Sequence, residues 1–154
     1  MMTDALLQLS SAQVVTVTAV STNTIDLAAA NPAGAARDIG GLNDLYMTFT
    51  IDENFATATS VEFQIITSAN ANLSSGNVIA STGAIVIAQL TLGRKPISMQ
   101  IPESLLSSLP IGQRYLGANY VVAGSAATTG KISAAVTDTP VSVGKYYPSG
   151  FTVA

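Results

Sequence analysis

Apolar and polar residues alternate with a period of two along most of the chain. Successive side chains of a β-strand point to opposite faces of a sheet, so this period predicts strands with one buried face. Some segments alternate clearly, and others show the same tendency more weakly. The clear segments are 45–51, 61–65, 97–101 and 132–137, and the weaker ones are 14–20, 25–27, 78–87 and 114–122, with an interruption expected at Gly83.

Turn-forming residues separate these segments, as expected for short strands joined by hairpins and loops. They lie at Asn31-Pro32 with Gly34, at Gly40-Gly41, at 70–76, at Gly93, at 110–112 and at 124–130. Only 103–109 can form a helical turn or two, since prolines bracket it. We therefore predict an all-β protein: an antiparallel β-sandwich, and within that class an eight-stranded jelly roll.

The last sixteen residues differ from the rest of the chain. Their two prolines and two glycines exclude a helix, yet the segment is too apolar for an idle tail. The sequence predicts one jelly-roll domain over residues 1–138 and an extended C-terminal arm over residues 139–154. Tyr146, Tyr147 and Phe151 are the candidate contacts of this arm. Two placements stay open: the arm packs on its own sandwich, or these three residues form an interface with a neighbouring subunit.

Composition narrows the possible functions. Histidine, cysteine and tryptophan are absent, and 10% of the residues are charged, compared with about 25% in an ordinary soluble domain. The usual general base, the soft metal ligands and the thiol nucleophile are therefore missing, and no disulfide can form. The net charge of −3 and the single pair of adjacent bases, Arg94-Lys95, exclude a general nucleic-acid binder. So few charges indicate either a Ser/Thr/Asn-rich exterior or a surface that a partner covers.

The sequence also bears on the compartment. No run of about 18 apolar residues is present, so we expect no membrane span. The N-terminal residues lack the basic region of a secretion signal, and the absence of cysteine fits a reducing environment. Both features favour a protein that is made in the cytoplasm and does not contact a membrane.

Segments that resemble catalytic or metal-binding motifs fail on spacing or context. Asp52 and Glu53 are adjacent, but neighbouring strand residues point to opposite sides, and we place both in a solvated hairpin loop. The segment 124–131 ends in Gly-Lys like a phosphate-binding loop, but it has one residue too many between its glycines and predicts a hairpin connection. Ser142 and Lys145 match Ser-x-x-Lys without the partner motifs of that enzyme class. We expect no enzyme, no cofactor and no metal ion.

One charged group is predicted to be structural. Asp26, Arg37 and Asp38 lie close together in a sequence with few charges. A bidentate contact between Arg37 and a carboxylate would hold the loop that follows the strand at 25–27. The alternative is that all three side chains are solvated and contribute little.

Several short segments occur in an order that resembles a family of tailed-bacteriophage capsid cement proteins. They are 21–27, 37–41, 73–75, 79–82, 114–116 and 129–132, and the resemblance as a whole spans roughly residues 12–138. It implies a small jelly roll that decorates the outer shell and clamps neighbouring major capsid proteins, with no catalytic residues to carry over. The chain departs from the family pattern in a longer loop at 28–36 and in residues 139–154, which have no counterpart.

We therefore expect a structural capsid cement protein that binds the outer surface of a phage head. Its expected partners are the major capsid protein and itself, as a homodimer, and its expected place is the virion after synthesis in the host bacterial cytoplasm. A surface of low charge allows close contacts with little desolvation of charge. The alternatives are a carbohydrate-binding β-sandwich module, which the lack of tryptophan disfavours, and a pilus or adhesin subunit, which the lack of a signal disfavours.

Overall fold

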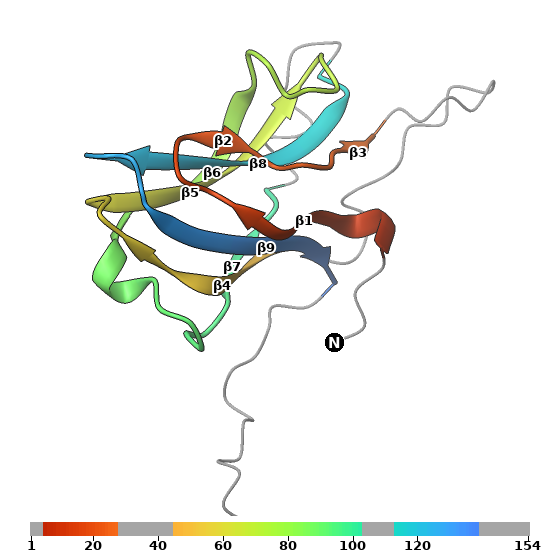
Figure 1. The fold of residues 1–154 in the computed structure, drawn as a ribbon. Coiled ribbons are helices and arrows are strands. Elements are labelled where there is room, and N and C mark those ends of the chain that lie inside the picture. Colours follow the sequence, from red (N-terminus) through yellow and green to blue (C-terminus); the bar gives the residue numbers. More distant parts are fainter. Residues whose placement is uncertain (1–4, 28–44, 103–112, 139–154) are drawn as a thin grey trace, which may run out of the picture.

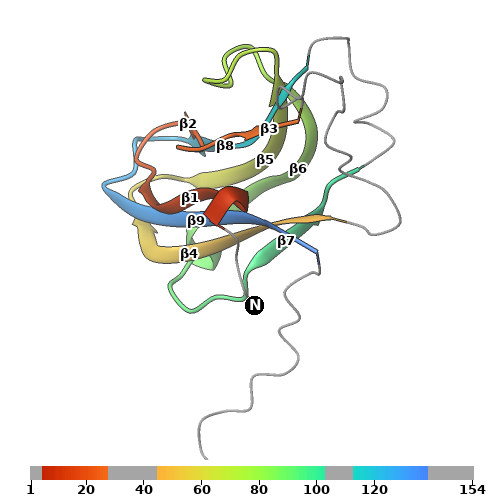
Figure 2. The same cartoon turned by 90° about the vertical axis from the view of Figure 1, so that its right-hand side faces the viewer.

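The protein folds as two antiparallel β-sheets packed face to face (Figures 1 and 2). The computed structural model describes residues 5–27, 45–102 and 113–138. The first sheet contains, in spatial order, β1 (Gln8–Val14), β9 (Thr129–Thr137), β4 (Tyr46–Ala56) and β7 (Ile97–Gln100). The second contains β2 (Ala19–Val20), β8 (Tyr115–Ala123), β5 (Ser60–Ser68) and β6 (Asn77–Val86), with β3 (Ile25–Asp26) also paired to β8. Two short 3-10 helices, Ala5–Leu7 and Ile87–Gln89, complete the described elements.

The strand order is that of a jelly roll. β2 and β3 pair with successive stretches of the same edge of β8, because Val20 lies opposite Asn119 and Ile25 lies opposite Leu116. Taken together, β2 and β3 form one interrupted edge strand, and the sheet orders then become β1-β9-β4-β7 and β2/β3-β8-β5-β6. The chain thus crosses repeatedly between the two sheets, as in a double Greek key. The predicted antiparallel sandwich is confirmed.

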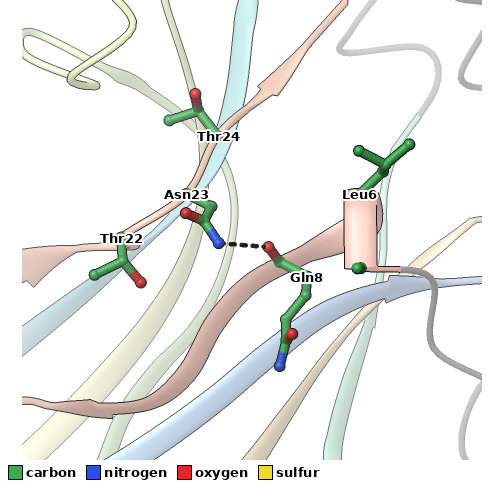
Figure 3. A pocket seen from close by; sticks show the side chains of 6 residues that line it. Leu6, Gln8, Thr22, Asn23 and Thr24 are labelled. Atoms are coloured by element: carbon green, nitrogen blue, oxygen red, sulfur yellow. Dashed lines mark hydrogen bonds between the residues drawn. The ribbon is translucent and has the colours of Figure 1, made fainter.

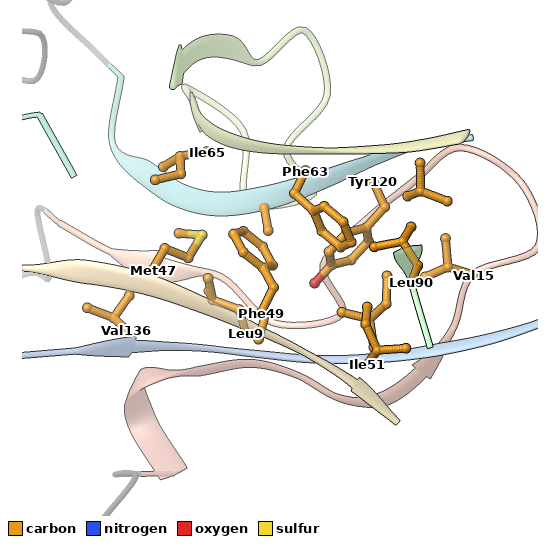
Figure 4. Packing of buried hydrophobic residues seen from close by; sticks show 14 of the residues in the cluster. Leu9, Val15, Met47, Phe49, Ile51, Phe63, Ile65, Leu90, Tyr120 and Val136 are labelled. Carbon is orange, nitrogen blue, oxygen red and sulfur yellow. The ribbon is translucent and has the colours of Figure 1, made fainter. Parts of the chain in front are cut away.

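A single core fills the space between the sheets (Figure 4). Phe49 of β4, Phe63 of β5 and Tyr120 of β8 meet at its centre, with ring centroids 5.1 to 6.2 Å apart. Tilted and edge-on pairs of this kind are favourable beyond the area that they bury. The alternation predicted from the sequence is the cause: in β4 and β5 the buried residues at every second position point inward. Each fully buried apolar side chain contributes about 1.5–3 kcal/mol.

The outer face of the second sheet carries a smaller apolar cluster. Leu73, in the loop between β5 and β6, is buried, and a β-carbon built at Gly117 of β8 would lie 2.3 Å from its Cδ1 atom. Only glycine therefore leaves room for Leu73 at this position. The loop is held by the Ser68 hydroxyl, which donates to the Ser74 carbonyl at 2.7 Å and accepts the Asn70 N–H at 3.0 Å.

The structure corrects three boundaries predicted from the sequence. The first strand is Gln8–Val14 rather than part of 14–20, since the chain turns after Val15, whose side chain is buried in the core. β4 continues through Asp52 and Glu53 to Ala56, so this pair is not in a hairpin loop. β6 is not broken at Gly83, because a bulge absorbs the residue at a φ of 68°. The predicted helical turn at 103–109 and the arm at 139–154 lie outside the described residues.

Candidate interaction surface

The predicted charged cluster includes an arginine that the sequence prediction missed. Arg114 donates two hydrogen bonds to Asp26, from Nε to Oδ1 at 2.6 Å and from Nη2 to Oδ2 at 2.5 Å. This bidentate contact raises the pKa of the Arg114 guanidinium, which also lies 5.2 Å from the centre of the Tyr115 ring. The contact holds β3 to the start of β8. Arg37 and Asp38 lie outside the described residues, so their pairing stays a prediction.

The two acids of β4 act separately. The Asp52 carboxylate accepts a hydrogen bond from the Ser133 hydroxyl at 2.6 Å, and Glu53 forms an ion pair with Lys131 at 3.0 Å. Both partners are on β9, the neighbouring strand, so each acid links two strands. In the described parts of the chain, no three acidic, histidine or cysteine side chains gather where they could hold a metal ion.

A row of polar side chains crosses the second sheet on its outer face. The Ser81 hydroxyl of β6 donates to Glu62 Oε1 at 2.5 Å, and Gln64 Nε2 donates to the same oxygen at 2.8 Å. Gln64 Oε1 in turn accepts from Asn119 Nδ2 of β8 at 2.8 Å. The bonds from Ser81 and then Gln64 lower the pKa of Glu62 below its ordinary value. The row is polar, but its members already satisfy one another.

A buried chain of hydrogen bonds joins the two sheets at the β1 side. Ser10 Oγ lies 2.7 Å from both the Tyr120 hydroxyl and Gln13 Oε1. Gln13 Oε1 also accepts the Thr22 N–H at 3.0 Å, while Gln13 Nε2 donates to the Val20 carbonyl at 2.8 Å. Since an amide oxygen can only accept, the Ser10 proton goes to Gln13, and Tyr120 donates to Ser10. Burial raises the pKa of the Tyr120 hydroxyl strongly, so it stays protonated.

Beside this chain of hydrogen bonds lies an open polar hollow of about 480 Å³ (Figure 3). It lies between the first 3-10 helix and the turn that joins β2 to β3, and Asn23 Nδ2 crosses its floor to the Gln8 carbonyl at 3.1 Å. The residues that line it are Ala5, Leu6, Gln8, Thr22, Asn23 and Thr24. None of these side chains carries a charge, so the hollow has no charged group that would bind an ionic ligand.

The loop end of the sandwich exposes apolar side chains. Val14, Val17 and Leu92 are exposed there by 58%, 57% and 64%, and we call these three residues the apolar rim. Two of them are attached to neighbouring strands at this end: Val14 pairs with Lys131, and the Leu92 N–H donates to Asn54 Oδ1. A shallow hollow of about 340 Å³ lies next to Val17, against the 124–126 turn between β8 and β9. The segment 124–131 is not the predicted hairpin connection: residues 124–128 cross from β8 in the second sheet to β9 in the first, and Gly130 and Lys131 already belong to β9.

The fold and these surfaces define a small jelly-roll protein. The surface of its described part is mainly uncharged, and the acidic side chains named above are bonded to neighbouring residues. A family model named Bbp16 matches residues 9–136, which is most of the chain. The chain therefore belongs to the Bbp16 family. No curated protein matches its sequence. The candidate interface residues Tyr146, Tyr147 and Phe151 lie outside the described residues.

Proposed function

We propose that this protein is a structural cement protein of a tailed-bacteriophage head. In this proposal it binds the outer surface of the capsid and stabilises contacts between neighbouring major capsid proteins. The short segments that resemble cement proteins support it, and the matched family model covers almost the same part of the chain. The jelly-roll topology agrees with the fold that the resemblance implies.

The observation that carries the proposal is the state of the acids on a surface with few charges. Asp26, Asp52, Glu53 and Glu62 each accept a hydrogen bond or form an ion pair within the protein. A partner that covers these strands would therefore remove little water from unpaired carboxylates. Desolvation of unpaired charges is the largest unfavourable contribution to forming such an interface. The same feature leaves no free carboxylate pair on β4 for acid–base chemistry.

The apolar rim is the contact that we assign to the capsid. Its three exposed apolar side chains would supply the apolar part of a small interface at this end of the sandwich. Many copies then act together on one shell, so each contact needs only modest affinity. Homodimers would bridge neighbouring capsid subunits.

The test is to mix the purified protein with expanded phage heads that lack it and to image them by cryo-electron microscopy. Ordered density at symmetry-related sites between capsid subunits is the expected result, with heads that resist heat and osmotic shock better than bare ones. Bare shells at saturating protein would overturn the proposal. A Val17→Lys and Leu92→Lys double variant should bind less, while Ser11→Lys, an exposed change on β1, should bind normally.

A carbohydrate-binding module is the second candidate, and the polar row on the second sheet is the observation that favours it. Glu62, Gln64 and Asn119 present one carboxylate and two amides on one sheet face, and such groups hydrogen-bond sugar hydroxyls. The mutual hydrogen bonds of these side chains count against it. Binding of glycans by the isolated wild-type protein, lost in Asn119→Ala, would favour this candidate over the first.

A further inference from the structure

Two adjacent basic residues in the described part of the chain have no acidic partner there. Arg114 and Lys131 each form an ion pair with a carboxylate. The other described basic residues, Arg94 and Lys95, lie in the loop between the second 3-10 helix and β7, and neither forms an ion pair with a described residue. A protein with a net charge of −3 thus carries an uncompensated positive site on this loop.

The loop is built around a tight turn. The Arg94 N–H donates to the Thr91 carbonyl at 3.0 Å, and Gly93, the third residue of the turn, has a φ of +80°. Such a bond and such an angle are typical of a type II turn, whose third position favours glycine. Leu90, just before the turn, is fully buried in the core, and the Leu92 N–H donates to a side chain of β4 at 2.6 Å. The backbone on either side of Leu92 is therefore held by specific contacts.

The side chains of this turn combine one apolar group with two cations. Leu92 is exposed by 64%, and Lys95 is exposed three residues further on. Arg94 Nη1 donates to the Gln89 carbonyl at 2.7 Å, which leaves the other N–H groups of the guanidinium without a described acceptor. Figures 1 and 2 show the loop, in green, projecting beyond β4 on the side away from the second sheet. We call Leu92, Arg94 and Lys95 the cationic turn.

A partner that covers Leu92 also meets the two charges beside it. Removing water from an ammonium or guanidinium group without supplying a counter-charge is strongly unfavourable, so an apolar partner surface fits this loop poorly. Carboxylates can replace the water around Lys95 and accept paired hydrogen bonds from Arg94. Because the turn is already formed, little conformational freedom is lost when it binds.

We propose that the cationic turn binds an acidic protein segment in which Asp or Glu side chains flank an apolar residue. The carboxylates pair with Arg94 and Lys95, and the apolar residue packs on Leu92. A second copy of this chain is a weaker partner, because the acids on its strands already bond within their own molecule. The inference deepens the proposed function, on which it rests for placing this acidic segment on the capsid surface.

Neutral variants test the two charges. Arg94→Gln combined with Lys95→Gln should bind expanded heads about tenfold more weakly than the wild type in about 50 mM NaCl. The matched control is Ser11→Asp combined with Asn72→Asp, which changes the net charge equally at exposed positions on β1 and in the loop between β5 and β6. It should bind within about twofold of the wild type. The wild-type affinity should also fall more steeply with added NaCl than that of the neutral variant.

Two outcomes of this experiment would overturn the inference and leave the cement function in place. One is a neutral variant that binds like the wild type, and the other is a control that binds as weakly as the neutral variant. Circular dichroism shows whether each variant folds. Lys95→Gln alone removes no described contact, so it keeps the test valid if the change at Arg94 disturbs the turn, and it should weaken binding about threefold.

A carbodiimide cross-link identifies the acidic partner directly, since this reagent joins an ammonium group to a carboxylate in contact with it. Lys131 and Glu53, 3.0 Å apart, are the internal control and should link in the free protein. Lys95 should link only after heads are added, and mass spectrometry should place the link on an Asp or Glu of the capsid protein. A link from Lys95 to a second copy, or no link while Lys131 reacts, would contradict the inference.

A titration without heads separates the inference from the proposed function. With poly-L-glutamate as the probe, NMR of the labelled protein should show amide shifts at Gly93 and Lys95 and smaller ones at Lys131, whose charge is already paired. Equal shifts at Lys95 and Lys131 would contradict the inference. Heads that stay bare while the turn responds to poly-L-glutamate would overturn the cement function and leave the acidic-segment site in place.

Discussion

The edge strands on the two sides of the sandwich are covered to different extents by the rest of the described structure. On the β1 side, which we call the closed edge, Asn23 and Thr22 cover the strand, and the Tyr120–Ser10–Gln13 chain ties it to the second sheet. On the β6 side, the open edge, the strand is longer and has a partner on one side only among the described strands. Among the described residues, stabilising contacts are therefore concentrated at the closed edge rather than at the open one.

This difference predicts that substitutions at the two edges have different effects on the free energy of unfolding. Changes at the closed edge should lower the free energy of unfolding, because buried hydrogen bonds and tight packing are lost there. Changes at the open edge should alter the free energy of unfolding little, because its side chains are largely exposed.

The largest contrast is expected for one substitution made at two glycines. Gly117→Ala, next to the closed edge, should cost about 3 kcal/mol, because its β-carbon would lie 2.3 Å from Leu73 Cδ1 and 3.0 Å from Ser21 Oγ. Gly83→Ala, on the open edge, meets no atom within 4 Å and should cost only about 1–2 kcal/mol for its φ of +68°. Urea unfolding measures both values. Equal losses, or a larger loss at Gly83, would break the comparison.

Removal of the Ser10 hydroxyl tests the buried link of the closed edge. Ser10→Ala leaves the Tyr120 hydroxyl without its partner inside the core, and we expect a loss of about 2 kcal/mol in unfolding free energy. Ser11→Ala, at an exposed position of the same strand, is the matched control and should stay within about 0.5 kcal/mol of the wild type. A Ser10→Ala variant as stable as the control would show that a water molecule or a shift of Tyr120 replaces the hydroxyl.

The same hydroxyl explains why the closed edge was harder to predict from the sequence than the rest of the sandwich. β4, β5 and β9 bury apolar residues on one face, and β7 packs the partly buried Ile97 and Met99 against the same core, so their period of two identified them. β1 buries Ser10 next to Leu9, and this polar residue interrupts the apolar pattern. Its burial depends on Tyr120, which is 110 positions away. No local pattern contains that information.

The charged pair follows the same rule. The sequence prediction placed Asp26 in a structural contact, but its arginine partner in the structure is 88 positions away. A correct choice of Arg114 required the register in which Asp26 lies opposite Tyr115, and this register depends on the complete second sheet. Edge strands were harder to predict than this ion pair, because a strand is recognised as an edge only when the partners of all strands are known. Only the topology shows that β6 is an edge among the described strands.

High pH should weaken the closed edge through Tyr120. Burial raises the pKa of its hydroxyl strongly, so the native state keeps this proton while the unfolded chain loses it above about pH 10. The stabilisation is fully present below pH 10 and is lost at about 1.4 kcal/mol per pH unit above it. Tyr120→Phe lacks this term, so it should start about 1 kcal/mol less stable at pH 7 and reach the wild type near pH 11. Urea unfolding across this range measures the difference, and parallel stability curves would contradict the prediction.

The smallest effect is expected at Glu62, which faces Ser81 of the open edge. The Ser81 hydroxyl and, second, Gln64 lower the pKa of Glu62, so their stabilisation is present above the unfolded value of about 4.3 and is lost as the pH falls through the folded pKa. The group is largely solvated, so Glu62→Gln should change the unfolding free energy at pH 7 by no more than about 0.5 kcal/mol. The sharper measurement is an NMR titration of the Glu62 carboxyl carbon. Its midpoint should lie below the ordinary value of a glutamate in the wild type and rise more in Ser81→Ala than in Gln64→Ala, because Ser81 is the larger cause. The reverse order would mean that Gln64 of β5, rather than Ser81 of β6, is the main cause of the lowered pKa of Glu62.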